Sequence, residues 1–317
     1  MFPFPSLARL HQGKFLLNRL GQRARHVFAG LFAGVLCAGQ AYAAPSISVL
    51  VAAPTGIYQE TADSLSQALK REGWKVTVSV PGQAPPNGAD LTVAIGTRAL
   101  EAALAGRARP VLSLLVPQLS YEQLASGQDQ VTALYLDQPL TRQLQLLGLA
   151  LPGVKKVGVA LGPDSRSLLR SLQSAAKSSG IQVNSALINQ GSDLYAALTD
   201  LAQDSQAFML LPDPMVAQRS MLHNFFLHTY RLKKPVLAYS APLARSGALL
   251  ALYSTPEQLG AESAAWMRES WARGKFNLGA PRYPERFTVA INRTVASSLE
   301  IELPSEDTLT RQLEAMQ

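Results

Sequence analysis

Short runs of apolar, often β-branched residues recur between residues 47 and 240, and longer segments of mixed polarity separate them. After the first run, Tyr58, Ala62, Leu65 and Leu69 stand three or four positions apart, the spacing of one helix face. The nine runs occupy residues 47–52, 75–80, 90–95, 110–116, 131–136, 155–161, 181–187, 206–211 and 234–240. Strands that are apolar throughout and alternate with helices are typical of parallel sheets covered on both faces. The pattern therefore predicts an α/β protein.

Nine strands are more than a single sheet of ordinary size contains. The alternation of predicted strands and helices can be divided into two halves near residue 137. Residues 44–317 are also enough for two ordinary domains. We predict two doubly wound parallel-sheet lobes with a central cleft. The first lobe is expected to hold residues 44–136 plus 252–278, and the second residues 137–251 plus 279–317.

Residues 1–43 have the pattern of a cleavable secretory signal peptide. An apolar run at 27–39 precedes the small-x-small tripeptide Ala41-Tyr42-Ala43, and no acidic residue occurs before it. The basic residues ahead of the run are Arg9, Lys14, Arg19, Arg23 and Arg25. The run is shorter than the ~20 residues that a membrane-spanning helix needs. We expect cleavage near Ala43 and a periplasmic product.

Loss of this leader changes the charge and the cysteine count. Five positive charges removed from a net +7 leave about +2, so the basic pI belongs largely to the leader. The single cysteine, Cys37, also lies in the leader. A chain without cysteine has no disulfide, thiolate metal site or cysteine nucleophile.

Few residues have the spacing of an enzyme active site. His223 and His228 are five apart on a predicted helix and point about 140° away from each other, whereas a zinc pair is four apart. They are interpreted as partly exposed helix histidines. Acidic pairs such as Asp137 and Asp213 are not distinguished from helix caps. Nucleophile-elbow, phosphate-loop and dinucleotide motifs do not occur, and no aromatic-basic stripe suggests nucleic acid. We expect no catalysis, cofactor or metal.

Small and capping residues follow the predicted strands. In parallel sheets, ligands bind beyond the carboxyl ends of the strands, where helix N-termini leave backbone N–H groups free. Each such residue taken singly has the composition of an N-cap, but together they describe a polar-lined cleft. Asp213, in Pro212-Asp213-Pro214, either caps a helix that begins at Pro214 or binds a ligand ammonium. Both roles stay open, because one carboxylate has two oxygens.

Several segments, in the same order, resemble the ABC-transporter substrate-binding protein family that includes tryptophan- and tyrosine-type amino-acid binders. They are DLTVAIGTRAL (90–100), LLPDPMV (210–216), RLKKPVLAYSAPLARSGALLALY (231–253) and RFTVAINRTVASSLEIELPS (286–305). The resemblance implies a type I periplasmic-binding fold, in which three crossovers join two lobes that close on a small ligand. It also implies delivery of that ligand to an ABC permease at the inner membrane.

The ligand-binding residues expected from the strand ends and the resemblance form one set. They are Thr55, Tyr58, Gly96, Thr97, Asp164, Ser165, Asp213, Ser240 and Tyr253. Two features depart from the family pattern: LSLLVPQLSYEQL (112–124) has no Asp-Pro turn, and Arg98 stands where a small residue or proline is usual. Both concern the first-lobe wall and leave the amino-acid specificity open, including an acidic ligand that pairs with Arg98.

The sequence therefore predicts an exported, monomeric solute-binding protein that captures a small polar molecule for an ABC importer. An amino acid or a related compound is the leading ligand class, and no nucleic acid is expected. The alternative is a periplasmic interaction or sensor-partner protein that keeps the fold without serving a permease.

Overall fold

The computed structural model describes residues 44–83 and 88–317, apart from the side chain of Ser192. The predicted signal peptide and its cleavage point lie outside these residues. Among the helices of the described part, none is long and apolar enough to cross a membrane.

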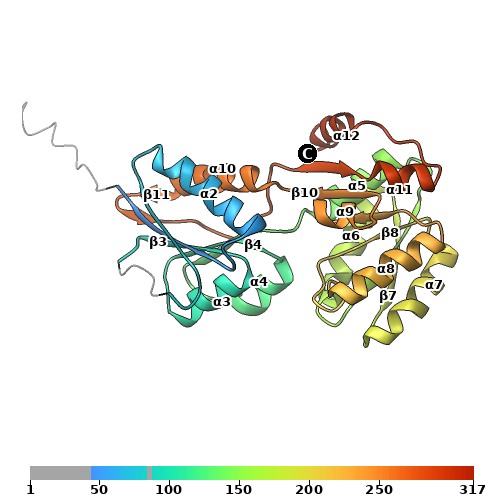
Figure 1. The fold of residues 1–317 in the computed structure, drawn as a ribbon, viewed down its shortest axis with the longest axis horizontal. Coiled ribbons are helices and arrows are strands. Elements are labelled where there is room, and N and C mark those ends of the chain that lie inside the picture. Colours follow the sequence, from blue (N-terminus) through green and yellow to red (C-terminus); the bar gives the residue numbers. More distant parts are fainter. Residues whose placement is uncertain (1–43, 84–87) are drawn as a thin grey trace, which may run out of the picture. The chain divides into compact units, whose positions relative to one another are not determined.

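The first sheet has five parallel strands in the order β2-β1-β3-β4-β5. Its strands are β1 (Ser46–Val51), β2 (Lys75–Ser79), β3 (Leu91–Ile95), β4 (Val111–Val116) and β5 (Val131–Tyr135). Its helices are α2 (Gly56–Lys70), α3 (Thr97–Ala105), α4 (Gln118–Ala125) and, from far along the chain, α10 (Pro256–Ser270). Helices α2 and α10 pack together on one face, whereas α3 and α4 cover the other (Figure 1). This sheet is doubly wound.

The second sheet has six strands in the order β13-β10-β9-β8-β6-β7. They are β6 (Lys156–Leu161), β7 (Gln182–Leu187), β8 (Ala207–Met209), β9 (Val236–Ala238), β10 (Leu250–Tyr253) and β13 (Thr288–Ile291). All neighbours are parallel except β13, which runs antiparallel to β10. The second sheet is thus parallel, as predicted, apart from the antiparallel edge strand β13.

Helices cover both faces of the second sheet as well. On one face lie η1 (Ser165–Leu168), α5 (Leu140–Ala150), α6 (Leu169–Ser179), α11 (Arg293–Ser298) and α12 (Glu306–Glu314), around a core that includes Leu144, Leu172 and Leu309. On the other lie η2 (Gly191–Asp193), α7 (Leu194–Asp204), α8 (Arg219–Arg231) and α9 (Ala241–Arg245), around Leu198 and Phe225. This sheet is therefore also a three-layer α/β unit.

Every predicted strand run contains a strand whose ends lie within two residues of the prediction. Most runs are buried from both sides. The edge strands β2 and β7 are largely exposed, whereas β5, which is also an edge strand, is buried at every position. A small hairpin, β11 (Trp271–Ala272) and β12 (Lys275–Phe276), was not predicted.

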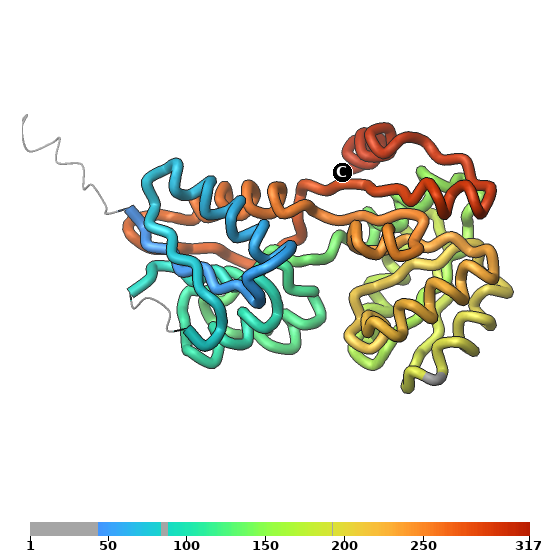
Figure 2. The backbone as a smooth tube through the Cα atoms, viewed as in Figure 1, coloured from blue at the N-terminus to red at the C-terminus, as the bar shows by residue number. Residues whose placement is uncertain are grey.

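The chain passes between the two sheets three times: after β5, after β10 and before β13, as the tube in Figure 2 follows. Buried side chains tie these crossovers together. Gln138 donates from Nε2 to Ser254 Oγ (2.9 Å), and Ser254 Oγ donates to the Arg286 carbonyl (2.6 Å). Arg142 donates from Nη1 to Gln138 Oε1 (2.6 Å) and to the Pro284 carbonyl (2.7 Å). Residues more than 100 positions apart are thus held at one place.

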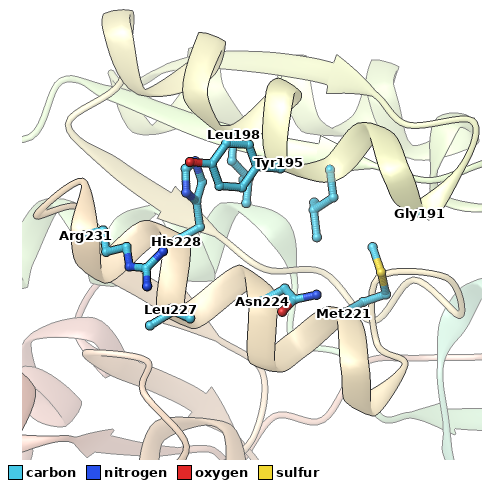
Figure 3. Close-up of a pocket in the computed structure, with 9 residues that line it drawn as sticks. Gly191, Tyr195, Leu198, Met221, Asn224, Leu227, His228 and Arg231 are labelled. Atoms are coloured by element: carbon cyan, nitrogen blue, oxygen red, sulfur yellow. The ribbon is translucent and has the colours of Figure 1, made fainter.

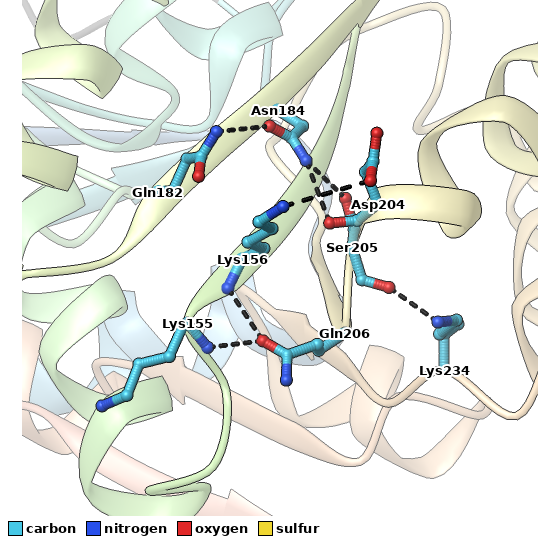
Figure 4. A network of polar contacts seen from close by, with 8 residues as sticks. All are labelled: Lys155, Lys156, Gln182, Asn184, Asp204, Ser205, Gln206 and Lys234. Atoms are coloured by element: carbon cyan, nitrogen blue, oxygen red, sulfur yellow. Dashed lines mark hydrogen bonds and ion pairs between the residues drawn. The ribbon is translucent and has the colours of Figure 1, made fainter.

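A second polar network closes the amino ends of β6, β7 and β8 (Figure 4). Gln206 Oε1 accepts from the N–H groups of Lys155 (2.6 Å) and Lys156 (3.0 Å), and Lys234 Nζ donates to the Ser205 carbonyl (2.7 Å). This end of the sheet is occupied by structural contacts, so the opposite, carboxyl ends remain for a site.

Candidate functional site

Most of the predicted site residues lie where a strand ends and a helix begins. Thr55 precedes α2, Gly96 precedes α3, Asp164 precedes η1 and Ser240 precedes α9. The side chains of Thr55, Asp164 and Ser240 make no capping hydrogen bond to their helices, and Gly96 has no side chain. Helix capping therefore does not occupy these three side chains.

Asp213 is fully buried and acts as a cap, although not for the helix that was predicted. Oδ1 accepts from the N–H groups of Met215 (2.9 Å) and Val216 (3.2 Å), and Oδ2 accepts from the N–H of Ser165 (3.1 Å). The prediction that a helix begins at Pro214 is wrong: residues 214–217 form a turn, and α8 begins at Arg219. The carboxylate closes this turn and joins it to the start of η1.

The approach of Asp213 to the end of β6 requires a glycine there. A Cβ added to Gly162 would lie 2.4 Å from Asp213 Oδ1, so any other residue would displace the carboxylate. Ser165, whose N–H holds Oδ2, is buried, and its Oγ has no hydrogen-bond partner within the described part of the chain. Asp213 and Ser165 therefore form one packed unit at the carboxyl end of the second sheet.

On the first sheet, Gly96 and Tyr58 meet. Gly96 has φ +91°, and a Cβ there would lie 2.6 Å from Tyr58 Cε1 and 2.9 Å from Ala52 Cβ. Only glycine accommodates both the backbone angle and the Tyr58 ring. Thr97 is half-buried, whereas Thr55 and Arg98 are exposed. The strand end thus offers a tyrosine ring and a threonine side by side with a tight backbone turn.

Asp137 is a residue that the predicted set left out. It follows β5, is 9% exposed, and accepts a 2.6 Å bond at Oδ2 from the N–H of Gln118, which starts α4. Burial raises the pKa of this carboxyl to about 6, although backbone N–H bonds oppose the rise. Its position at a strand end, before Gln138-Pro139, could have indicated a ligand-binding residue from the sequence alone. A helix-capping role explained the same position equally well.

Tyrosine hydroxyls gather around Asp137. Tyr239, at the end of β9, has its pKa raised to about 12 by burial and by the charges of Asp137 and Asp213. Tyr283, before β13, has its pKa raised to about 12 by burial, Asp137 and Glu122. The ring of Tyr283 also stands 5.2 Å from that of Tyr135. Burial is the main cause of the raised pKa of both tyrosines, and the charge of Asp137 adds to it in each case.

One hydrogen bond joins the two halves directly. Gln123 of α4 donates from Nε2 to Oδ1 of Asp164, the residue before η1 (2.8 Å). The carboxyl ends of the two sheets thus contribute residues to the same region. The partner of the Asp164 carboxylate there is a protein side chain, and its predicted role in ligand binding stays a prediction.

Tyr253 lies apart from this group. It lines a hollow of about 700 Å³ with Arg245 and Asn292, between α9, β13 and α11. Burial raises the pKa of the Tyr253 hydroxyl, and Arg245 opposes that rise. Tyr253 therefore lines this hollow and not the region where Asp164 and Gln123 meet.

The two helix histidines differ from each other, which was not predicted. His223 is exposed, but His228 is buried, because it contacts Thr199 on α7 and the Tyr195 ring stacks on it. No group of three or more His, Cys, Asp or Glu side chains in residues 44–83 and 88–317 is arranged to hold a metal. The described site is therefore one of hydroxyls, carboxylates and aromatic rings.

Comparison with known proteins identifies both a family and a fold. A family model described as "ABC transporter substrate binding protein" matches residues 75–312. Among curated protein sequences, none matches the chain. The similar solved structures include the ABC domain in complex with L-Trp from Streptococcus pneumonia, which is 18% identical with a TM-score of 0.59 over 84% of this chain and 98% of that one.

Two further structures are similar over most of the chain. The ligand-free, open structure of a substrate binding protein with adhesive properties from Clostridium difficile is 19% identical, with a TM-score of 0.65 over 83% of this chain and 97% of that one. A periplasmic ribose ABC transporter from Conexibacter woesei is 11% identical, with a TM-score of 0.53 over 86% and 99%. At such identities the likeness shows the fold, which is of the type I periplasmic-binding class, as predicted.

Proposed function

Because this chain belongs to the ABC transporter substrate-binding protein family, we propose that it captures an amino acid or a related small compound for an ABC importer. The ligand would lie between the carboxyl ends of the two sheets and would be handed unchanged to a permease at the inner membrane. The predicted signal peptide supports a periplasmic location. The proposal involves no chemistry on the ligand, since the family is one of binding proteins.

The observation that carries the proposal is that buried carboxylates follow strands of both sheets: Asp137 comes after β5 and Asp213 after β8. Carboxylates placed in this way are the groups with which a ligand ammonium forms charge-assisted hydrogen bonds, and half-buried Tyr239 follows the neighbouring strand β9. Asp213 already accepts three backbone N–H bonds, whereas the carboxyl of Asp137 carries a pKa raised by burial. A buried carboxyl of this kind gains most from a cationic partner. We therefore assign ammonium recognition chiefly to Asp137, with Tyr239 as a hydrogen-bonding neighbour.

Aromatic side chains near this group favour a ligand with an apolar or aromatic body. Tyr58 lies against Gly96 on the first sheet, and Tyr135 and Tyr283 stand edge to face beside Asp137. Offset and edge-to-face contacts of this kind suit a planar ligand group. One structural neighbour is a complex with L-Trp, so aromatic amino acids are the first compounds to test.

The test is a thermal-shift screen of residues 44–317 after unfolding and refolding to remove any bound ligand. A ligand present at 100 times its Kd adds about 2.7 kcal/mol to the free energy of unfolding, which raises Tm by a few degrees. We expect a shift with aromatic or apolar amino acids and a smaller one with the same compounds lacking the amino group. A larger shift with the deaminated acids would reject the ammonium site and favour Arg98 as an anion contact.

Tyr239→Phe removes one hydroxyl and keeps the ring, so it tests the site without emptying the core. We expect the Kd of the ligand to rise roughly 3- to 10-fold, the effect of losing one hydrogen bond. Tyr230→Phe, on the exposed face of α8, is the matched control and should leave the Kd unchanged. Equal affinities in all three proteins would exclude Tyr239 from the site.

Delivery to a permease is tested separately, by ligand uptake into membrane vesicles that contain a candidate ABC importer from the same organism. Ligand-dependent uptake that needs this protein supports the transport role. If no amino acid of a broad panel changes Tm, the alternative function is favoured. In that case the chain is a periplasmic interaction protein that keeps the fold for contact with an envelope partner.

A further inference from the structure

A cavity of about 350 Å³ opens between α7 and α8, on the helices that cover one face of the second sheet (Figure 3). No residue of the predicted ligand-binding set lines it. Its wall is largely apolar, formed by Leu194 and Leu198 of α7 and by Met221 and Leu227 of α8. Leu194 and Leu198 are four positions apart, and Met221, Asn224 and Leu227 follow one another at intervals of three, so each helix turns one face toward the cavity. The volume falls in the range of small-molecule sites.

One wall residue, His228, has an unmet hydrogen-bonding group. Its side chain is 6% exposed, and Nδ1 is buried with no partner among the described residues. The Thr199 hydroxyl donates to the Tyr195 carbonyl (2.9 Å), so at its 2.9 Å contact with His228 it accepts from Nε2–H. Nδ1 of the neutral ring is therefore a free acceptor. Burial and the charge of Arg231 lower the pKa of His228, which keeps the ring neutral.

Two side chains frame this acceptor differently. The Tyr195 ring stands 3.9 Å from the His228 ring, and Tyr195 is 63% exposed, so this ring lies beside the imidazole at the protein surface. Arg231, one helical turn beyond His228, is exposed and has no ion-pair partner in the described part of the chain. The cavity thus combines an apolar wall, an acceptor beside an aromatic ring and an unpaired cation at one end.

We propose that this cavity is a second binding site, distinct from the strand-end site, for a small aromatic carboxylate that carries one hydroxyl donor. The carboxylate pairs with the Arg231 guanidinium, and the hydroxyl donates to Nδ1 of His228. The aromatic body packs on Leu194, Leu198 and Leu227, with the Tyr195 ring over it. The chemistry is complementary at both ends, because Arg is always a donor and neutral Nδ1 is only an acceptor. The site needs no metal and no change in the sheet.

The test uses 4-hydroxybenzoate as the probe, with benzoate and phenol as partial probes. Residues 44–317 contain two histidines, His223 and His228, so a histidine-labelled protein reports both rings by NMR. We expect saturable changes at His228 with 4-hydroxybenzoate, whereas exposed His223 stays unchanged. The nitrogen shifts should also identify the Nε2–H tautomer. Benzoate and phenol should bind roughly 3- to 10-fold more weakly, since each lacks one polar contact.

Two variants locate the contacts. Arg231→Gln should raise the Kd of 4-hydroxybenzoate roughly 3- to 10-fold and leave the Kd of phenol unchanged. Arg219→Gln, at the exposed first position of the same helix and outside the cavity, should change neither. Tyr195→Ala removes an exposed ring and should raise the dissociation rate without unfolding α7. Binding to all three variants is read from the His228 resonances, so binding at the strand-end site does not interfere.

The proposal is overturned if His228 shows no saturable change up to roughly 10 mM probe, which fills about nine-tenths of a site with a Kd of about 1 mM. It is also overturned if benzoate and 4-hydroxybenzoate bind equally well, because Nδ1 then accepts nothing from the ligand. Equal binding by the Arg231→Gln protein would remove the carboxylate contact and with it the assigned ligand class.

Discussion

At Asp213, a charged group is fully buried and still satisfied. Its two oxygens accept from three backbone N–H groups, two in the following turn and one at the start of η1. A buried carboxylate without such partners is strongly unfavourable, and several N–H donors remove most of that penalty. The residue therefore supports the strand ends on which the candidate site is built, and any part it takes in ligand binding is additional.

Asp213→Ala should lower the free energy of unfolding by about 2–4 kcal/mol, because three buried N–H groups lose their acceptor. Urea denaturation of residues 44–317 measures the change. Asp200→Ala, an exposed carboxylate on α7, is the control and should stay within about 0.5 kcal/mol of the parent. Equal stability of the two variants would mean that the caps contribute nothing.

Asp137 gives a pH-dependent prediction. Burial raises the pKa of this carboxyl from its ordinary value of 3.8 to about 6 in the folded chain, so between these pH values the folded state holds a proton that the unfolded state has lost. The free energy of unfolding therefore falls as pH rises through this window, by on the order of 3 kcal/mol in total. Asp137→Asn keeps an oxygen for the Gln118 N–H and removes the charge.

We expect Asp137→Asn to be more stable than the parent at pH 7.5 and similar to it at pH 4, in urea titrations at both values. The same variant should bind an amino ligand more weakly, since it lacks the carboxylate. A stability difference that is independent of pH would show that burial of the charge is not its cause.

At the scale of elements, the three crossovers are held together by the buried side chain of Arg142. Arg142 of α5 bonds Gln138, the Pro284 carbonyl and Gln317 Oε1 (2.9 Å), and its guanidinium stands 4.7 Å from the centre of the Phe287 ring. These partners come from segments before and after the second sheet. One side chain thus connects separate parts of the chain at the place where the sheets are joined.

Arg142→Met should reduce the free energy of unfolding by about 2–4 kcal/mol, since it leaves buried acceptors without a donor. Arg268→Met removes an ion pair with Glu72 whose side chains are 45% and 31% exposed, and should cost less than about 1 kcal/mol. Chemical denaturation compares the two. A loss at Arg268 as large as that at Arg142 would contradict the argument from burial.

At the scale of the molecule, the bond from Gln123 to Asp164 is a contact between residues of the two sheets' ends. This hydrogen bond is exposed, so its contribution to the free energy of folding is small. A ligand held between the strand ends, however, would pass this bond as it leaves, so the bond should slow ligand dissociation. Asp164→Ala should therefore leave Tm within about 1–2 °C of the parent. It should raise the dissociation rate of the ligand identified by thermal shift roughly 2- to 10-fold, measured by stopped flow.

Ser171→Ala, at an exposed hydroxyl on α6, is the control and should change neither quantity. An unchanged dissociation rate in Asp164→Ala would mean that the two sheets' ends separate without breaking this bond.

Much of the fold was readable along the chain. The runs at 47–52, 90–95 and 155–161 are strands because a strand buried on both faces must be apolar at every position, which is a local property. The division into two sheets followed from the number of such runs. Short β10 and β13 were not among the nine runs, since their strand character depends on pairing with each other.

The composition of the site depended instead on which strand ends lie together. Asp213 is bonded to the N–H of Ser165, 48 positions away, and Asp137 to the N–H of Gln118, 19 positions away, so no short spacing in the sequence relates these groups. His228 was expected to be partly exposed, but Thr199 and Tyr195 of another helix bury it. Local apolar pattern determined where the strands and helices form. Strand order and crossover packing decided which polar groups meet, because contacts between distant segments exist only once the sheets have assembled.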